Sequence, residues 1–369
     1  MIVDKKREPD KCDLSTYPNE KKLDIVLQKK MTTYLHRSLP MCIILANDNY
    51  KGWYYSNFVQ IMSNTFDDGE IELNYITPRD GYFDVAEVIC LGYPMLYYDG
   101  DFTSYIIQMI NRGYYMVVHI DEFYIPDKGA YEEYHLVHAS LVYGYNMDKR
   151  EIYGIGFDDD MTFREITFDF DAFNEAYESG KRNYKEDAFW CEWSAVQLIK
   201  PRSPQVPFRF DIRRFNNELE DYMTSRKDDY KLYSFDFPMD SFTCGVKVYD
   251  TVIDKLYKLK EGIVNIDYRA IHLIAEHKKG MLERFEYISD NFNVPDEYSE
   301  YLEKYAVLVE NVNKFRLAYM ANFSLTQWDQ TVDDKKKEFL DTAIATIDGM
   351  KKTEMSILMD LMKILRTLE

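Results

Sequence analysis

Short apolar runs in the first half of the chain predict a β-sheet. Three of them, residues 114–120, 136–145 and 151–157, are rich in the β-branched and aromatic residues that favour strands. Turn residues separate these runs, at 127–129 and again at 146–148. The spacing suits antiparallel pairing better than helical crossovers, so we expect three consecutive strands of one sheet.

Two segments upstream of these strands carry apolar residues at helical spacing. Residues 53–62 and 102–111 repeat apolar positions every three or four residues. Gly113 follows the second segment, where a helix C-cap is expected. Helices that precede a sheet in this way indicate the α+β class.

The second half of the chain has a different pattern, with long helical segments joined by short connections. We expect helices over residues 244–259, 268–292, 297–323 and 333–368. The last segment has an apolar stripe at three- and four-residue steps, which is typical of a helix that buries one face. The simplest arrangement of these four segments is a helical bundle. The stripe consists of Phe339, Ala343, Ile347, Met350, Leu358, Leu361 and Leu365.

A proline-rich segment divides the two halves. Three prolines lie between residues 200 and 207, where they interrupt both helix and sheet. A chain of 369 residues also exceeds the size at which one hydrophobic core stops growing. We therefore expect two domains, an α+β domain over 1–205 and a helical domain over 206–369.

Charge and composition exclude several classes of partner. The chain has 64 acidic and 45 basic residues, a net charge of −19, which repels nucleic acid and anionic lipid. It has no apolar run long enough to span a bilayer and no secretory signal, so a cytoplasmic protein is expected. The five scattered cysteines and the lack of glycine-rich phosphate loops predict no disulfide framework, metal or nucleotide cofactor.

Histidines gather in the predicted sheet. Half of the six, His119, His135 and His138, lie within residues 118–160. If the strands on either side of the 146–150 turn pair, His138 and Asp158 lie at comparable heights. Such a pair would make a general base for a thiol or hydroxyl nucleophile. The alternative is a structural histidine beside a solvated acidic turn at 158–160.

The sequence from His138 to Asn146, His-x-x-x-x-x-Gly-Tyr-Asn before a short strand ending in Asp, resembles papain-like, bacteriocin-leader-type cysteine peptidases. The whole chain is more similar to the butirosin biosynthesis protein H family, through residues 53–61, 113–126, 245–250 and 267–279. The resemblance covers most of the chain. It implies a papain-like domain before a helical region, in a pathway that builds peptide-like natural products on carrier proteins.

The resemblance also implies roles for individual residues. His138 corresponds to the catalytic base and Asp158 to its orienting acid, while the nucleophile should be a cysteine near the start of the first helix. Cys42 is the nearest thiol, and a helix starting there would lower its pKa. If residues 41–45 instead form a strand or core segment, Cys42 is an inert buried residue. Ser56 is a weaker substitute nucleophile.

These expectations give two candidate functions. The first is an acyltransferase that moves an acyl group from a carrier-protein thioester, held on a phosphopantetheine arm, to a small amine through Cys42, His138 and Asp158. Transfer to water would give hydrolysis instead. The second is a catalytically inactive family member that serves as a scaffold or binding protein in the same pathway.

Overall fold

The computed structural model describes residues 13–76, 82, 84–98, 100–203, 206–227, 239–323 and 330–368, without the side chains of 186 and 187. The chain forms two compact units. Unit 1 comprises Met1–Asp48 and Tyr82–Ser203, and unit 2 comprises Asn49–Gly81 and Pro204–Glu369. The expected contiguous domains therefore need correction, because residues 49–81 belong with the helical half.

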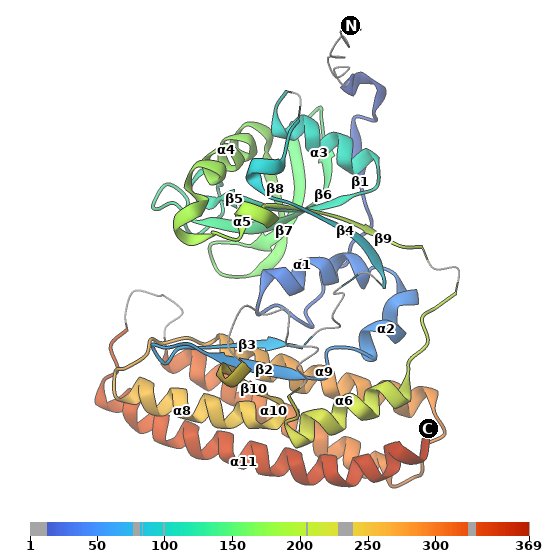
Figure 1. Ribbon diagram of the computed structural model, residues 1–369, viewed down its shortest axis with the longest axis vertical. Coiled ribbons are helices and arrows are strands. Elements are labelled where there is room, and N and C mark those ends of the chain that lie inside the picture. Colours follow the sequence, from blue (N-terminus) through green and yellow to red (C-terminus); the bar gives the residue numbers. More distant parts are fainter. Residues whose placement is uncertain are drawn as a thin grey trace, which may run out of the picture. The chain divides into compact units, whose positions relative to one another are not determined.

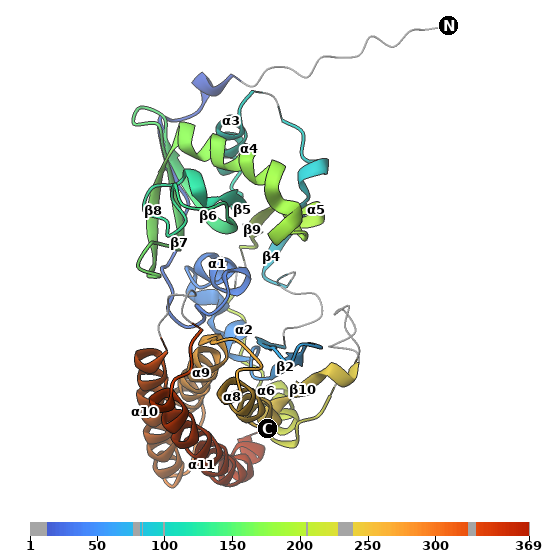
Figure 2. The same ribbon diagram turned by 90° about the vertical axis from the view of Figure 1, so that its left-hand side faces the viewer.

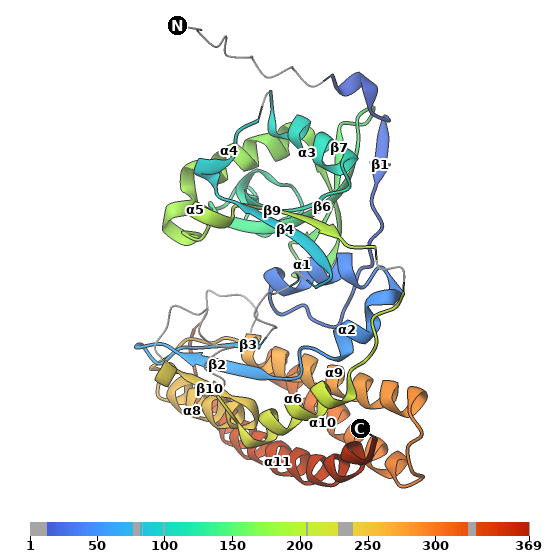
Figure 3. The same ribbon diagram turned by 45° about the vertical axis from the view of Figure 1, so that its right-hand side comes forward.

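Unit 1 is built on a seven-stranded antiparallel sheet, six strands of which follow the order β4-β9-β5-β6-β7-β8. The seventh strand, β1, pairs with the C-terminal end of β6. The three predicted strands are confirmed as β5, β6 and β7, which pair in sequence order. Figure 3 shows β4 and β9 side by side at one edge of the sheet. The strands are β1 (Glu20–Lys22), β4 (Ala86–Leu91), β5 (Tyr115–Asp121), β6 (Val137–Asn146), β7 (Glu151–Phe157), β8 (Phe163–Asp169) and β9 (Val196–Pro201).

Helices cover both faces of this sheet (Figure 1). Helices α3 (Phe102–Asn111) and α4 (Phe170–Asp187) bury their apolar residues against one face, together with Cys191 of the short helix α5 (Cys191–Ser194). Helix α1 (Leu35–Ile44) packs on the other face. Each face thus has its own apolar cluster, which explains why every residue of β5 is buried.

Local signals define helix α3 at both ends. Asp101 accepts a hydrogen bond from the Ser104 backbone N–H at 2.8 Å, which caps the N-terminus. Gly113 has φ +83°, the left-handed conformation that favours glycine after a helix. Both the helix predicted over 102–111 and its glycine C-cap are confirmed.

Unit 2 combines helices with a three-stranded antiparallel sheet in the order β10-β2-β3, a sheet that the sequence pattern did not predict. Strand β10 (Phe242–Cys244) brings the distant second half of the chain beside β2 (Ile61–Thr65) and β3 (Ile71–Tyr75). Figure 2 views the long helices of this unit obliquely along their axes. The helices are α2 (Lys51–Tyr55), α6 (Ile212–Thr224), α8 (Val248–Lys260), α9 (Arg269–Asn291), α10 (Tyr298–Asn322) and α11 (Asp334–Leu365).

The helix predicted over 53–62 is wrong. Helix α2 ends at Tyr55, and the chain enters strand β2 at Ile61. The buried guanidinium of Arg284 explains this early end, because it donates to the carbonyls of Tyr55 at 3.1 Å and Asn57 at 2.6 Å. These carbonyls lie at the C-terminal end of α2, where a cation is favourable. A long-range contact therefore overrides the local helical pattern.

Candidate functional site

Histidines and carboxylates meet where strands β5 and β6 lie side by side in unit 1. Strand β5 ends at Asp121, and Glu122 follows in the 3-10 turn Glu122–Tyr124. The chain returns into β6, so that Ile120 lies opposite His138. Antiparallel pairing thus places Asp121 and Glu122 beside the histidines that precede and begin β6.

His138 forms a fixed pair with Glu122. Its Nδ1 lies 3.0 Å from Glu122 Oε1, and Lys128 Nζ lies 3.1 Å from the same oxygen. Lys128 also donates to the Phe157 carbonyl at 2.7 Å, and its side chain is only 1% exposed. A Cβ at Gly156 would lie 2.9 Å from Lys128 Nζ, so a glycine there leaves room for the ammonium group. The buried lysine therefore holds the carboxylate in place behind the imidazole.

The charges around Glu122 favour its ionised form. Burial by itself raises the pKa of the Glu122 carboxyl, but the hydrogen bond from His138 and the charge of Lys128 outweigh burial and lower that pKa overall. The His138 side chain is 40% exposed, and no described residue bonds to its Nε2. Because Nδ1 faces the carboxylate, Nε2 is the nitrogen left available to a ligand.

Asp121 anchors the loop between the two strands. It is fully buried and accepts hydrogen bonds from Ser179 Oγ at 2.7 Å, the Leu136 backbone N–H at 3.1 Å and His135 Nδ1 at 2.7 Å. Burial raises the pKa of Asp121, and these donors more than compensate, leaving the pKa below its usual value. The His135 ring packs on Phe123 with ring centroids 4.6 Å apart. Through its bonds to His135 and to Ser179 of helix α4, Asp121 connects loop 122–136 to that helix.

His119 is held in its neutral form. Trp190 Nε1 donates to His119 Nε2 at 3.1 Å, so His119 Nδ1 carries the proton that faces the Ala195 carbonyl at 3.2 Å. Burial lowers the pKa of His119 to about 4, with a smaller contribution from the nearby charge of His138. The hydrogen bond to His119 thereby fixes the ring of Trp190.

Exposed aromatic side chains extend from Trp190. Phe189 contacts both tryptophans edge to face, with ring centroids 5.6 Å from Trp190 and 5.8 Å from Trp193. Phe189 and Trp193 are more than half exposed. Aromatic side chains are enriched at binding interfaces, and we define Phe189, Trp190 and Trp193 as the aromatic surface.

The structure does not place Cys42 where a nucleophile is required. Helix α1 begins at Leu35, so the expectation of a helix starting at Cys42 is wrong, and the thiol lies in the last turns of the helix. Cys42 has no exposed surface and packs with Leu39 and Leu141. Burial raises the pKa of this thiol to about 12. Its environment corresponds to the alternative of an inert buried cysteine.

Ser56, the substitute nucleophile, has a buried hydroxyl that is already hydrogen-bonded. It lies at the end of α2 in unit 2, whereas the histidines lie in unit 1. Its buried hydroxyl donates to the Gly52 carbonyl at 2.8 Å and accepts from the Asp211 backbone N–H at 2.9 Å. These two bonds give Ser56 a structural role in joining α2 to the segment before α6.

Asp158 has other partners than His138, which corrects the expected pair. Its carboxylate lies 2.5 Å from Arg164 Nε and accepts from the Thr162 backbone N–H at 2.7 Å. Both partners belong to the hairpin between β7 and β8, so Asp158 stabilises that turn. The carboxylate on His138 is Glu122. The sequence pattern predicts the short β6–β7 hairpin but not the course of the longer β5–β6 connection, so it does not predict this pair.

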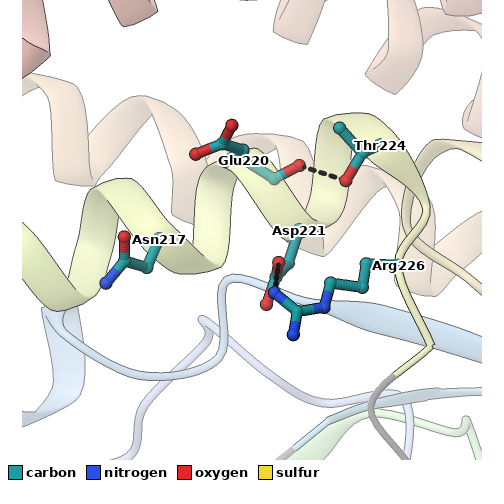
Figure 4. Close-up of a pocket in the computed structure, with 5 residues that line it drawn as sticks. All are labelled: Asn217, Glu220, Asp221, Thr224 and Arg226. Carbon is teal, nitrogen blue, oxygen red and sulfur yellow. Dashed lines mark hydrogen bonds and ion pairs between the residues drawn. The ribbon is translucent and has the colours of Figure 1, made fainter.

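A depression on helix α6 offers a second site to consider (Figure 4). It has a volume of about 530 Å³, and its polar side chains are largely engaged with one another or with neighbouring elements. Thr224 donates to the Glu220 carbonyl, Arg226 pairs with Asp221, and Arg366 pairs with Glu220. Its lining residues are Asn217, Glu220, Asp221, Thr224 and Arg226. These exposed pairs leave no converging group for a ligand.

No protein-family model and no curated protein matches this chain, so its function has to be inferred from the geometry of unit 1. Within the described residues, no group of three or more histidine, cysteine, aspartate or glutamate side chains is arranged to hold a metal ion. Across the same residues, no helix is both long and apolar enough to cross a membrane.

Proposed function

We propose that the protein is a papain-like member of the butirosin biosynthesis protein H type that binds thioester-linked acyl groups without forming an acyl-enzyme. On this proposal it serves a natural-product pathway as a binding protein for an acyl or peptidyl carrier protein and its phosphopantetheine arm. The burial of Cys42 is the observation that carries this choice over covalent acyl transfer.

A buried thiol with a pKa near 12 is a poor nucleophile for two reasons. At pH 7 the thiolate fraction of such a group is about 10⁻⁵, and the thiolate is the species that attacks a carbonyl. Cys42 also has no surface that a thioester could reach. Covalent chemistry at Cys42 would require helix α1 to leave the sheet, which would expose the apolar cluster on that face.

The aromatic surface and His138 supply the groups that a binding role requires. Trp190 is held by His119, so its ring is fixed in place before a ligand arrives. Rigid aromatic rings bind apolar chains and amide groups at a low cost in conformational entropy. His138, which lies near the start of the strand paired with the one that carries His119, adds a partly exposed hydrogen-bonding nitrogen.

The test is binding of an acetyl-loaded acyl carrier protein to the full chain, measured by titration calorimetry. The matched control is the same carrier without its phosphopantetheine arm. We expect the loaded carrier to bind and the replacement Trp193→Ala to weaken binding about fivefold or more, because Trp193 is 58% exposed. Equal binding of both carriers, or no binding of either, would contradict the proposal.

Intact-protein mass spectrometry tests the covalent alternative. Incubation with the acetyl thioester of N-acetylcysteamine should leave the mass of the native protein unchanged. An acetyl adduct that is lost in Cys42→Ala would instead restore the acyltransferase with Cys42 as nucleophile.

A further inference from the structure

We propose that His138, positioned by Glu122, is a general base that drives hydrolysis of a bound acyl thioester by direct attack of water. The inference rests on the proposed function, since the base acts on the acyl group that the protein is proposed to bind. It adds an activity that needs no thiol and no residue of unit 2. Glu122 is a positioning residue, because it acts through the imidazole.

The hydrogen bond to Glu122 determines which nitrogen of His138 is basic. A carboxylate 3.0 Å from Nδ1 retains the proton there, so the neutral ring has its lone pair on Nε2. The ring is partly exposed, which gives water access to that nitrogen. The negative charge behind the ring also stabilises the imidazolium that forms when Nε2 takes a proton.

Lys128 gives this pair a rigidity that a surface pair lacks. The carboxylate of Glu122 is only 7% exposed, and the ammonium of Lys128 contacts both it and the Phe157 carbonyl. Glu122 therefore cannot turn away from His138 without leaving a buried lysine unpaired, which is costly. Such a buried, locked carboxylate suits an orienting role better than a solvated acid does.

The proposed step balances without any further reactant. Water gives a proton to His138 Nε2 while its oxygen bonds to the carbonyl carbon. The carbon–sulfur bond then breaks, and His138 returns the proton to the leaving thiolate. The products are a carboxylic acid and a thiol, and nothing is oxidised or reduced.

Asp158 does not fit the role of orienting acid, and His135 fits the role of general base less well than His138 does. Asp158 is bound to Arg164 and Thr162 in the next hairpin. His135 lies before β6 in the loop, and its pair with Asp121 connects that loop to Ser179 of helix α4. His138 is the histidine that combines a place on a strand, a locked carboxylate and an exposed ring.

The experiment measures hydrolysis of the acetyl thioester of N-acetylcysteamine by the full chain, followed by loss of thioester absorbance. We expect a rate above the buffer control, reduced about 10²-fold or to the buffer rate in His138→Gln, because positioned bases contribute about 10²–10⁴. His135→Gln and Cys42→Ala should retain the rate of the native protein. A rate equal to buffer in the native protein, or full activity of His138→Gln, would overturn the assignment.

Two replacements of Glu122 separate positioning from a structural role. Glu122→Gln should lower the rate, because the imidazole loses the carboxylate that holds the proton on Nδ1 and orients the ring. Glu122→Asp keeps a carboxylate and should recover part of the rate. Equal loss of rate in both variants would contradict the role of Glu122.

A thioether analogue, with a methylene between sulfur and carbonyl, distinguishes failure of this inference from failure of the proposed function. Its binding is followed by tryptophan fluorescence. Binding without hydrolysis of the thioester would refute the general base and leave the binding function intact. Absence of both binding and hydrolysis would refute the two together.

Discussion

The ammonium of Lys278 lies 2.8 Å from the carboxylate of Glu354, and neither side chain reaches solvent. Three phenols complete the site by donating to Glu354, from Tyr222 at 3.0 Å, Tyr249 at 2.9 Å and Tyr305 at 2.9 Å. The pair joins helix α9 to helix α11, and the tyrosines add α6, α8 and α10. One carboxylate therefore connects all five of these helices.

Glu354→Leu should strongly destabilise unit 2. The change leaves the Lys278 charge buried without a partner, which costs about 3–5 kcal/mol, and it also removes the acceptor of three phenols. Urea unfolding followed by circular dichroism measures the loss. The double variant Lys278→Met with Glu354→Leu should recover part of it, since no buried charge remains. If the loss of stability in the double variant equals the sum of the losses in Lys278→Met and Glu354→Leu measured separately, the two residues are not coupled in this way.

Arg284→Met should destabilise the same unit by a different route. Arg284 is buried among backbone carbonyls, and its loss leaves those of Tyr55, Asn57 and Gly280 without this donor. Unsatisfied buried polar groups cost about 1–3 kcal/mol each, so we expect a loss of at least about 2 kcal/mol. Arg284→Lys keeps the charge but not the forked donor geometry. Its free energy of unfolding should therefore lie between that of the native protein and that of Arg284→Met. A stability for Arg284→Met equal to that of the native protein would contradict the assignment.

The stability of unit 1 should fall in mild acid because of His119. Its pKa is about 4 in the folded protein and about 6.5 when unfolded, so the unfolded chain takes up this proton first as the pH falls. The contribution is fully present above pH 6.5 and is lost progressively towards pH 4, by about 3 kcal/mol. His277 in unit 2 shifts in the same direction. Denaturant titrations at several pH values measure the free energy of unfolding of the native protein and of His119→Gln, and the difference isolates the contribution of His119. The same pH dependence in both proteins would disprove this contribution.

Alkylation of the native protein should separate its thiols by burial. Cys90 lies exposed on the edge strand β4, while Cys42, Cys191 and Cys244 are buried. Iodoacetamide at pH 8 should therefore modify Cys90 within minutes and leave the three buried thiols largely intact, as measured by peptide mass mapping. In denaturant all four of these thiols should react. Rapid labelling of Cys42 in the native state would contradict the packing of helix α1.

The parts of the fold that sequence patterns predicted are those set by local interactions. Helix α3 has a side-chain cap at one end and a glycine at the other, and strands β6 and β7 join through a short turn. The sequence pattern places segment 49–81 in the wrong half, because its partners, Arg284 and strand β10, lie more than 170 residues away in the sequence. Periodicity carries no information on contacts of that range.

The candidate site shows the same limit at the level of single residues. The sequence pattern predicts a strand that contains His138, and this strand position is confirmed. The sequence pattern does not predict its carboxylate, because Glu122 reaches it across the fifteen-residue loop 122–136, whose course depends on Asp121 and helix α4. Proximity in a hairpin suggested Asp158, but the charge of Arg164 on the next strand draws that side chain away.

The interleaved order of the two units determines when each can form during synthesis. Strands β2 and β3 leave the ribosome before the sheet of unit 1 is complete, yet their partner β10 and their covering helices follow more than 160 residues later. A nascent chain therefore carries an unfinished hairpin through the whole assembly of unit 1. For the same reason a fragment beginning at residue 206 lacks two of the three strands of its sheet, and any recombinant dissection of this protein should retain residues 49–81 with the helices.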